Sequence, residues 1–225
     1  MQALSICAVV ANGELKGSSG ELAVLEAAEL IIAADGGANA LVSLGIYPHV
    51  LVGDLDSVTP DVLAACEQHG CEVLHYSPIK DETDTELALI EAVRRGAREI
   101  VLLGALGGRI DHALANLMLL SLPALEGRHV RIYDGRSSCY LAHSLTIVDG
   151  AVGDVVSLIP LAGAAIGIVT SGLLYALSGD TLTYGAARGV SNELTEPRAT
   201  IETGSGTLLV VHTPAERCDA RVTPG

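Results

Sequence analysis

The sequence contains no tryptophan and no phenylalanine, and aromatic residues make up only 3% of its 225 residues. Any aromatic surface for a flat ligand must therefore come from tyrosine or histidine. Basic residues are also scarce, because 13 lysines and arginines stand against 27 acidic residues and give a formal net charge of −14. A chain of this charge repels a nucleic-acid backbone, so we do not expect a nucleic-acid partner.

Long apolar runs are absent as well. Although 49% of the residues are hydrophobic, no stretch reaches the roughly 18 apolar residues of a membrane span. The N-terminal sequence MQALSICAVV has no basic segment, so a signal peptide is not expected. The five cysteines are an odd number without CxxC spacing, which is typical of free thiols in a reducing compartment. We therefore expect a cytoplasmic protein without a membrane partner.

The first part of the chain, residues 1–134, alternates between apolar runs of strand length and helical stretches. The runs lie at 4–10, 30–34, 49–53, 71–76, 99–104 and 129–133. Most lack polar alternation, which is typical of strands buried on both faces. The stretches between them carry helix-end signals, such as Thr59-Pro60-Asp61 and a capping box from Thr83 to Glu86. The pattern predicts an α/β domain with a mostly parallel open sheet.

The second part, residues 137–213, has a different pattern. Short β-rich runs, including LLYAL at 173–177, are separated by turn residues such as Ser178-Gly179-Asp180. This spacing predicts an antiparallel, all-β sandwich or barrel. The segment from Asp134 to Ser137 is the expected boundary between the domains. Residues 214–225 are polar, contain two prolines and are expected to be a frayed tail.

Acidic residues gather where the predicted parallel strands end, on the edge where α/β sheets bind ligands. Asp54 and Asp56 follow one strand and, on an extended backbone, would point to the same side. Carboxylates in such a pair suit Mg²⁺, which prefers oxygen ligands and phosphates. Asp81 and Asp84 flank a helix start and offer a further carboxylate. The alternative is a solvated turn in which Asp84 only favours the helix dipole.

Two glycine pairs follow strands and precede helices, at Gly36-Gly37 and Gly107-Gly108. Glycine lets a backbone approach phosphate closely, but a tight turn explains each pair equally well. There is no GxxxxGK[ST] loop. Arg109 either binds two phosphate oxygens through its guanidinium or is an ordinary surface residue. His112, next to Asp111, either takes part in catalysis or caps its helix. The residues point to metal-assisted handling of a phosphorylated ligand.

Seven segments together resemble one known family, the thiamine pyrophosphokinases (thiamine diphosphokinases). They are DGGAN at 35–39, GDLDS at 53–57, KDETDTE at 80–86, GGRIDHALAN at 107–116, SGLLYAL at 171–177, RGVSNE at 188–193 and GTLLV at 206–210. The resemblance covers about residues 5–212 and both domains, in the family's order. It implies an α/β nucleotide-binding domain followed by a thiamine-binding β-sandwich. It also implies a homodimer with active sites at the subunit interface.

The implied reaction transfers a diphosphate group from ATP to the hydroxyethyl group of thiamine and gives thiamine diphosphate and AMP, with Mg²⁺ required. The resemblance assigns the metal to Asp54, Asp56 and Asp84, and catalysis to Asp54, Asp56, Asp81 and Asp84. The resemblance also assigns nucleotide binding to Asp35, Gly36, Gly37, Asn39, Ser57, Lys80, Thr83, Gly107, Gly108, Arg109, Asp111, His112 and Asn116. It assigns thiamine binding to Tyr175, Arg188, Ser191 and Asn192.

The chemistry of diphosphate transfer depends mainly on positioning and electrostatics. We expect Asp54 and Asp56 to hold the metal, Lys80 and Arg109 to neutralise phosphate charge, and Asp81 or Asp84 to accept the proton of the thiamine hydroxyl. Tyr175 either stacks on thiamine or fills the sandwich core. A diphosphokinase for a pterin alcohol would share the acids without needing the RGVSNE segment. A non-catalytic binding module would have no use for the whole set of carboxylates.

Overall fold

The computed structural model describes residues 6–216. The chain divides into two units, one ending at Tyr140 and one beginning at Leu141. This division falls a few residues after the turn from Asp134 to Ser137, where the sequence places the boundary. Of the predicted tail at 214–225, the residues up to Glu216 are described and have no helix or strand, and the remainder lies outside the described residues.

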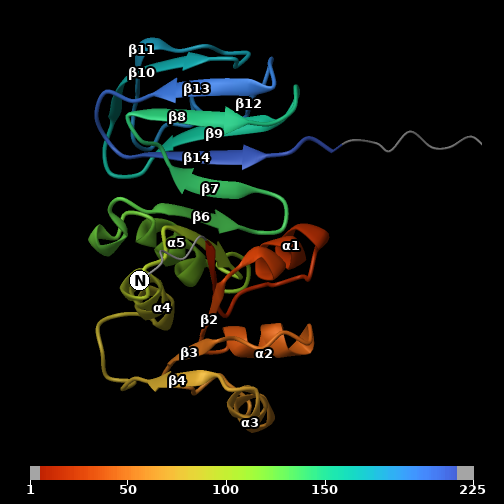
Figure 1. The fold of residues 1–225 in the computed structure, drawn as a ribbon. Helices are drawn as coiled ribbons and strands as arrows, with labels where there is room; N and C mark the ends of the chain where they lie inside the picture. Colours follow the sequence, from red (N-terminus) through yellow and green to blue (C-terminus); the bar gives the residue numbers. More distant parts are fainter. Residues whose placement is uncertain (1–5, 217–225) are drawn as a thin grey trace, which may run out of the picture. The chain divides into compact units, whose positions relative to one another are not determined.

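The first unit is built on a mostly parallel sheet whose strands follow the order β7-β6-β5-β1-β2-β3-β4 (Figure 1). Strands β1 to β6 are parallel to one another, and β7 runs antiparallel to β6. The strands are β1 (Ile6–Val10), β2 (Leu30–Ala34), β3 (Val50–Gly53), β4 (Glu72–His75), β5 (Glu99–Leu103), β6 (His129–Tyr133) and β7 (Ser138–Leu141). The prediction of an open parallel sheet is confirmed.

The central strands are buried on both faces because their residues are almost all apolar. Every residue of β2 and β3 is buried, as are four of the five residues of β1 and of β5. Strand β4 lies at the edge and keeps Glu72 and His75 exposed. The continuous apolar runs of the sequence therefore correspond to strands with helices on both sides.

The helices are α1 (Ser19–Ala27), α2 (Gly37–Ser43), α3 (Pro60–Gln68), α4 (Asp84–Arg94) and α5 (Ile110–Leu119), with a short 3-10 helix at Pro123–Leu125. Leu25 of α1, Leu41 of α2 and Cys66 of α3 share one core cluster with alternate residues of β1, β2, β3 and β5. Helix α4 contacts β1, β2 and β3. Successive strand residues face opposite sides of the sheet. The apolar residues of these strands that face away from α1, α2 and α3 are therefore covered by α4.

Helix starts follow the sequence signals, with one correction. Thr59 precedes Pro60, the first residue of α3, as expected. The Thr83 hydroxyl accepts a hydrogen bond from the Glu86 amide, but only this half of the predicted capping box forms. A complete capping box occurs at the start of α1, where Ser18 and buried Glu21 bond reciprocally.

The second unit consists of antiparallel strands in the orders β12-β9-β14 and β11-β10-β13-β8. They are β8 (Leu145–Asp149), β9 (Val155–Pro160), β10 (Ala165–Ser171), β11 (Ser178–Leu182), β12 (Asn192–Glu193), β13 (Arg198–Glu202) and β14 (Leu208–Thr213). Buried residues from both sets of strands, including Val156, Ile168, Ile201 and Val210, form its core. The prediction of a separate β-rich part is confirmed.

One predicted strand of the second unit is wrong. The run at 173–177 is not a strand, and β11 begins instead at Ser178, inside the expected turn. Pairing between β10 and β11 is interrupted by register shifts around Ile168. Gly179 has a φ of 76°, which a glycine adopts without strain. The turn residues are thus absorbed into an irregular strand.

Candidate active site

A pocket of about 460 Å³ opens at the carboxyl ends of the parallel strands of the first unit. Parallel α/β sheets bind ligands at this edge. The lining residues come from the last residue of β2, from the segments that follow β1 to β5, from the first turn of α4 and from the first two turns of α5. They are Ala11, Asn12, Gly13, Ala34, Asp35, Asp54, Asp56, Ser57, Pro78, Lys80, Glu82, Thr83, Asp84, Thr85, Gly104, Ala105, Gly107, Arg109, His112 and Asn116.

Close backbone packing shapes one part of this pocket. The Gly13 amide donates a hydrogen bond of 2.7 Å to the Gly104 carbonyl. A Cβ on Gly13 would lie 2.2 Å from that carbonyl oxygen, and Gly104 itself has a φ of 60°. Since a side chain at Gly13 would clash with backbone, glycine is required for the segments after β1 and β5 to meet here.

Three carboxylates meet in the pocket. Asp35 follows β2, Asp54 follows β3 and Asp84 begins α4, and one oxygen of each lies within 4.8 Å of the others. Gly53 permits this approach, because a Cβ there would lie 3.0 Å from Asp35 Cβ and 3.2 Å from Asp84 Cγ. Among residues 6–216 this is the one group of three or more metal-ligating side chains.

Lys80 neutralises part of this charge. Its ammonium lies 3.0 Å from Asp84 Oδ1 and 3.8 Å from Asp54 Oδ2, and it donates a hydrogen bond of 3.1 Å to the Ser77 carbonyl. Partial burial lowers the pKa of Lys80, but the hydrogen bond and charge of Asp84, with the charges of Asp54 and Asp35, outweigh it and raise the pKa above 10.5. Lys80 is therefore a permanent cation of the pocket.

The Asp35 carboxyl is the most buried of the three, at 6% exposure. Burial raises the pKa of Asp35 above 3.8, because desolvation disfavours the carboxylate. Hydrogen bonds from Ser57 and Gly36 oppose this rise, and the nearby charge of Asp84 adds to it. A cation beside the group would stabilise all three carboxylates in their charged form.

The structure places Asp56 differently from the sequence expectation. Strand β3 ends at Gly53, and Leu55 adopts a φ of 67°, so the extended alternation that would align Asp54 with Asp56 is broken. The Asp56 carboxylate lines the pocket outside the group of three and accepts a hydrogen bond of 2.9 Å from the Ser57 hydroxyl. The third carboxylate beside Asp54 and Asp84 is therefore Asp35, whereas the sequence analysis expected Asp56.

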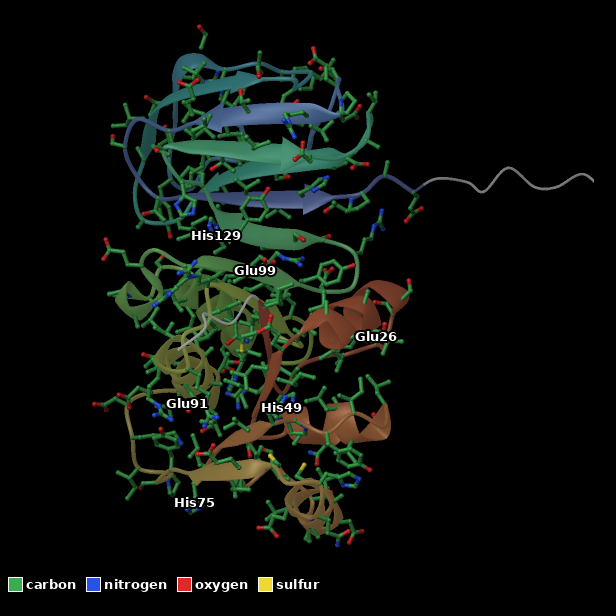
Figure 2. The ribbon with its side chains drawn as sticks, in the orientation of Figure 1. Glu26, His49, His75, Glu91, Glu99 and His129 are labelled. Atoms are coloured by element: carbon green, nitrogen blue, oxygen red, sulfur yellow. The ribbon has the colours of Figure 1, made fainter. Side chains whose placement is uncertain are left out.

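His75 supports the same turn from the end of β4. Its Nε2 lies 3.2 Å from the Asp54 carbonyl oxygen. Figure 2 labels His75 at the carboxyl end of β4 and His49 just before β3, so the two mark opposite ends of this part of the sheet. The turn that carries Asp54 is thus held from the neighbouring strand, a contact that no sequence signal indicates.

Further candidate residues line the pocket on helix α5 and before it. Arg109 and Asp111 form an exposed bidentate pair, at 3.1 Å for Nε–Oδ1 and 2.5 Å for Nη2–Oδ2, which lowers the pKa of Asp111 to about 2. Because an exposed pair contributes little stability, the guanidinium can exchange Asp111 for a phosphate at small cost. Asn116 is buried and donates a hydrogen bond of 2.8 Å to the Ala105 carbonyl, and His112 lines the pocket one turn earlier.

Several predicted residues lie outside the lining. Gly36 and Gly37 pack against the end of β1 and the segment after it, where added Cβ atoms would lie 2.3 Å from Asn12 Oδ1 and 2.2 Å from the Val10 carbonyl oxygen. Asn39 bonds the Ser57 carbonyl at 2.8 Å and the Thr59 amide at 3.1 Å, which fixes the loop that carries Asp56. Asp81, Gly108 and Asp111 are likewise not among the lining residues.

The predicted thiamine residues all lie in the second unit. Tyr175 is 68% exposed, so the alternative that it fills the core is wrong. Arg188 donates a 2.7 Å hydrogen bond to Asp180, and the Ser191 amide donates one of 3.0 Å to the Ser157 hydroxyl. Asn192 is buried, and its amide bonds the backbone of Tyr175.

Sequence reasoning missed some lining residues. Asn12 and Gly13 come one residue after the first apolar run, so the rule applied to the other strand ends would have found them. Glu82 and Thr85 sit within a segment already singled out, between its chosen residues. Neither residue has a distinguishing spacing of its own.

The comparisons with known proteins agree across both units. Residues 22–133 match the family model for the thiamin pyrophosphokinase catalytic domain, and residues 142–208 match its vitamin B1 binding domain. A thiamine pyrophosphokinase from Bacillus subtilis is 29% identical over 184 residues, which cover 81% of this chain and 86% of the relative. Thiamine pyrophosphokinase 1 from Arabidopsis thaliana is 30% identical over 215 residues, covering 83% and 79%.

Solved structures show the same likeness. The crystal structure of thiamine pyrophosphokinase from Bacillus subtilis superposes with a TM-score of 0.83 at 26% identity, covering 94% of this chain and all of the other. Thiamin pyrophosphokinase from Candida albicans, at 17% identity, shares the fold with a TM-score of 0.78 over 93% of this chain and 89% of that one.

The acidic pocket at the carboxyl edge of a parallel sheet, followed in the chain by an antiparallel β unit, defines an α/β enzyme that handles phosphorylated ligands. The two matched domain models and the relatives that span most of the chain narrow this class. The chain belongs to the thiamine pyrophosphokinase family, whose members transfer pyrophosphate from ATP to thiamine.

Proposed function

We propose that diphosphate transfer from ATP to the hydroxyethyl oxygen of thiamine takes place at the pocket of the first unit and yields thiamine diphosphate and AMP. The observation that carries the proposal is the group formed by Asp35, Asp54 and Asp84 around Lys80. Diphosphate transfer needs little covalent chemistry from a protein, and it needs charged groups in fixed positions. This pocket supplies both signs of charge.

The group fits Mg²⁺. Three carboxylates and one ammonium leave a formal charge of −2, and the donors are all oxygens, as a hard divalent cation prefers. Asp35, Asp54 and Asp84 would hold the ion, and Asp56 lies in the same lining. Bound there, magnesium would neutralise the charge of the ATP phosphates.

Lys80 and Arg109 neutralise the remaining charge of the phosphates. Lys80 is held beside the acids by Asp84, whereas Arg109 is exposed and reaches the lining from the start of α5. Gly107 lines the pocket, and its φ of 83° is one that a glycine adopts without strain, so this part of the lining is bare backbone that the nucleotide can approach. His112 and Asn116 border the same space and contribute to nucleotide binding.

The proton of the thiamine hydroxyl has two predicted acceptors, Asp81 and Asp84. Asp81 is exposed and is not part of the lining, whereas Asp84 lines the pocket and its Oδ1 is buried. A carboxylate has two oxygens, so one oxygen of Asp84 could face the magnesium ion while the other accepts the proton of the thiamine hydroxyl. We therefore assign the acceptor role to Asp84.

Thiamine carries a cationic thiazolium and a flat aminopyrimidine, and the second unit supplies an aromatic face for them. Tyr175 is exposed and lies within the segment that matches the vitamin B1 binding model. Arg188 and Ser191 follow in the same matched region and contribute polar contacts. The enzyme is proposed to act in the cytoplasm as a homodimer with the active site shared between subunits.

The homodimer is testable by complementation. Mixing an Asp54→Ala protein with a variant carrying changes at Arg188, Ser191 and Asn192 should restore part of the activity if the sites are shared. A mixture as inactive as both parents would place each site within one chain.

Product analysis tests the reaction itself. The protein, incubated with thiamine, ATP and Mg²⁺, should release AMP and form thiamine diphosphate. Replacing thiamine by a hydroxymethyl pterin should stop AMP release. ADP with thiamine monophosphate would contradict diphosphate transfer, and AMP release with the pterin alone would point to the pterin diphosphokinase instead.

A further inference from the structure

Tyr175 is exposed on a segment that has lost its expected strand pairing. Residues 174–177 belong to no sheet, and Leu173 makes one isolated bridge to Leu194. Tyr175 is 68% exposed, and its neighbour Leu174 is 53% exposed. An aromatic ring on an irregular segment can bind a ligand well only when its backbone is fixed, because ordering it on binding costs free energy.

Backbone hydrogen bonds hold the segment on either side of Tyr175, from the Leu174 amide to the Glu193 carbonyl and from the Thr170 amide to the Leu177 carbonyl, both at 2.9 Å. Between them, the Asn192 side chain fixes the backbone of Tyr175 itself. Its Oδ1 accepts a hydrogen bond of 3.0 Å from the Tyr175 amide, and its Nδ2 donates one of 2.8 Å to the Tyr175 carbonyl. The same Oδ1 accepts a 2.9 Å bond from the Glu193 amide. The Asn192 side chain therefore bonds both backbone groups of Tyr175, as a strand partner would, and Asn192 is only 8% exposed.

The backbone around Asn192 is itself tightly held. Ser191 adopts a φ of 61°, and its amide is bonded to the Ser157 hydroxyl. A Cβ on Gly189 would lie 2.2 Å from the Leu158 carbonyl oxygen, so the chain packs against β9 as only glycine allows. Since non-glycine residues rarely adopt this φ, the strained residue indicates that the surroundings enforce one position for Asn192.

We propose that Asn192 is a positioning residue, which acts on thiamine through Tyr175 by holding the Tyr175 ring ready to stack on the cationic thiazolium. This inference rests on the proposed function. Three of the four hydrogen-bonding positions of the amide are used within the chain, which favours this role over a direct bond from Asn192 to the pyrimidine. The side chain must both accept from and donate to one residue, which an amide does and a carboxylate cannot.

A double-mutant cycle separates the two roles. Tyr175→Ala should raise the KM for thiamine by about 2- to 30-fold, the range expected for a lost cation–aromatic contact, with the KM for ATP unchanged. Asn192→Ala should raise the thiamine KM in the same way. The double variant should be no worse than Tyr175→Ala alone, because Asn192 has no effect without the ring.

The outcomes are distinguishable. Additive increases in the double variant would show that Asn192 contacts thiamine directly and would overturn the inference. If Tyr175→Ala leaves the thiamine KM unchanged, both the inference and the thiamine role of Tyr175 are wrong, while AMP release would still report the reaction. Thr146→Val is the matched control, since buried Thr146 also bonds one backbone amide, that of His143 at 2.9 Å, in the same unit.

A spectroscopic readout covers variants whose activity is too low to measure. Because the sequence has no tryptophan, Tyr175→Trp introduces a single indole at this position. We expect thiamine to quench its fluorescence, and Asn192→Asp in that background to lower its anisotropy and weaken the quenching. Unchanged anisotropy and quenching in the folded Asn192→Asp protein would contradict the positioning role.

Discussion

Replacing Asp54 by asparagine tests the charge arrangement of the pocket most sharply. The change keeps the shape of the side chain but removes one of three clustered negative charges and the partner that lies 3.8 Å from the Lys80 ammonium. The formal charge of the group then falls from −2 to −1, so it no longer matches a divalent cation. Loss of one well-placed electrostatic group reduces turnover by about 10²- to 10³-fold, and we expect that loss in kcat.

The assay has two readouts. AMP and thiamine diphosphate are separated and quantified over a range of Mg²⁺ concentrations, and the rise of Tm with Mg²⁺ is measured without nucleotide, because a bound ion stabilises the folded state. Asp61→Asn, an exposed acid in the first turn of α3, is the matched control. Turnover within threefold of the unaltered protein, together with an unchanged Mg²⁺-induced rise in Tm, would refute the assignment of Asp54.

Three further outcomes are expected. Gly37→Ala places a Cβ 2.2 Å from the Val10 carbonyl oxygen, and should lower the free energy of unfolding by about 1–3 kcal/mol; an unchanged urea midpoint would show that the backbone yields freely. Burial raises the pKa of Asp154, but bonds from the Ala151 and Ala215 amides and from His212 outweigh it and leave the pKa below 3.8. Asp154 therefore stabilises the folded state above about pH 4, and this stability is lost as the pH falls through the lower folded-state pKa. Asp154→Asn should lower the free energy of unfolding at pH 7 by about 1–3 kcal/mol, and below pH 4 its free energy of unfolding in urea should depend less on pH. The same pH dependence in the variant and the unaltered protein would contradict the assignment. The KM for thiamine should rise with added salt, because the net charge of −14 attracts a cationic vitamin; a KM indifferent to ionic strength would remove this contribution.

The parallel sheet could be predicted because the composition of each strand and the alternation of strands and helices along the chain indicate the same fold. The apolar runs that contain β2 and β3 have the composition of strands buried on both faces, and each is followed directly by an acid of the pocket. The carboxyl edge of the sheet then brings Asp35 and Asp54 together from separate strands. This follows from strand direction alone.

Other features depend on contacts that local sequence does not encode. The spacing of Asp54 and Asp56 suggests one shared side, but the left-handed φ of Leu55 breaks the alternation. The run around Tyr175 has strand composition, yet its backbone is bonded by the side chain of Asn192, which lies 17 residues further along the chain. Asp81 and Asp84 share one motif, but of the two only Asp84, the first residue of α4, lines the pocket.

The most direct test of the account follows the two transferred phosphates. ATP labelled separately at the β- and γ-phosphorus is incubated with thiamine and Mg²⁺, and the labels are traced in the products of the unaltered protein and of Asp84→Asn. We predict that both labels arrive in thiamine diphosphate in equal amounts, together with AMP, and that Asp84→Asn loses this transfer. Recovery of the γ label alone, with ADP, or full transfer by Asp84→Asn would contradict diphosphate transfer at the three-carboxylate pocket.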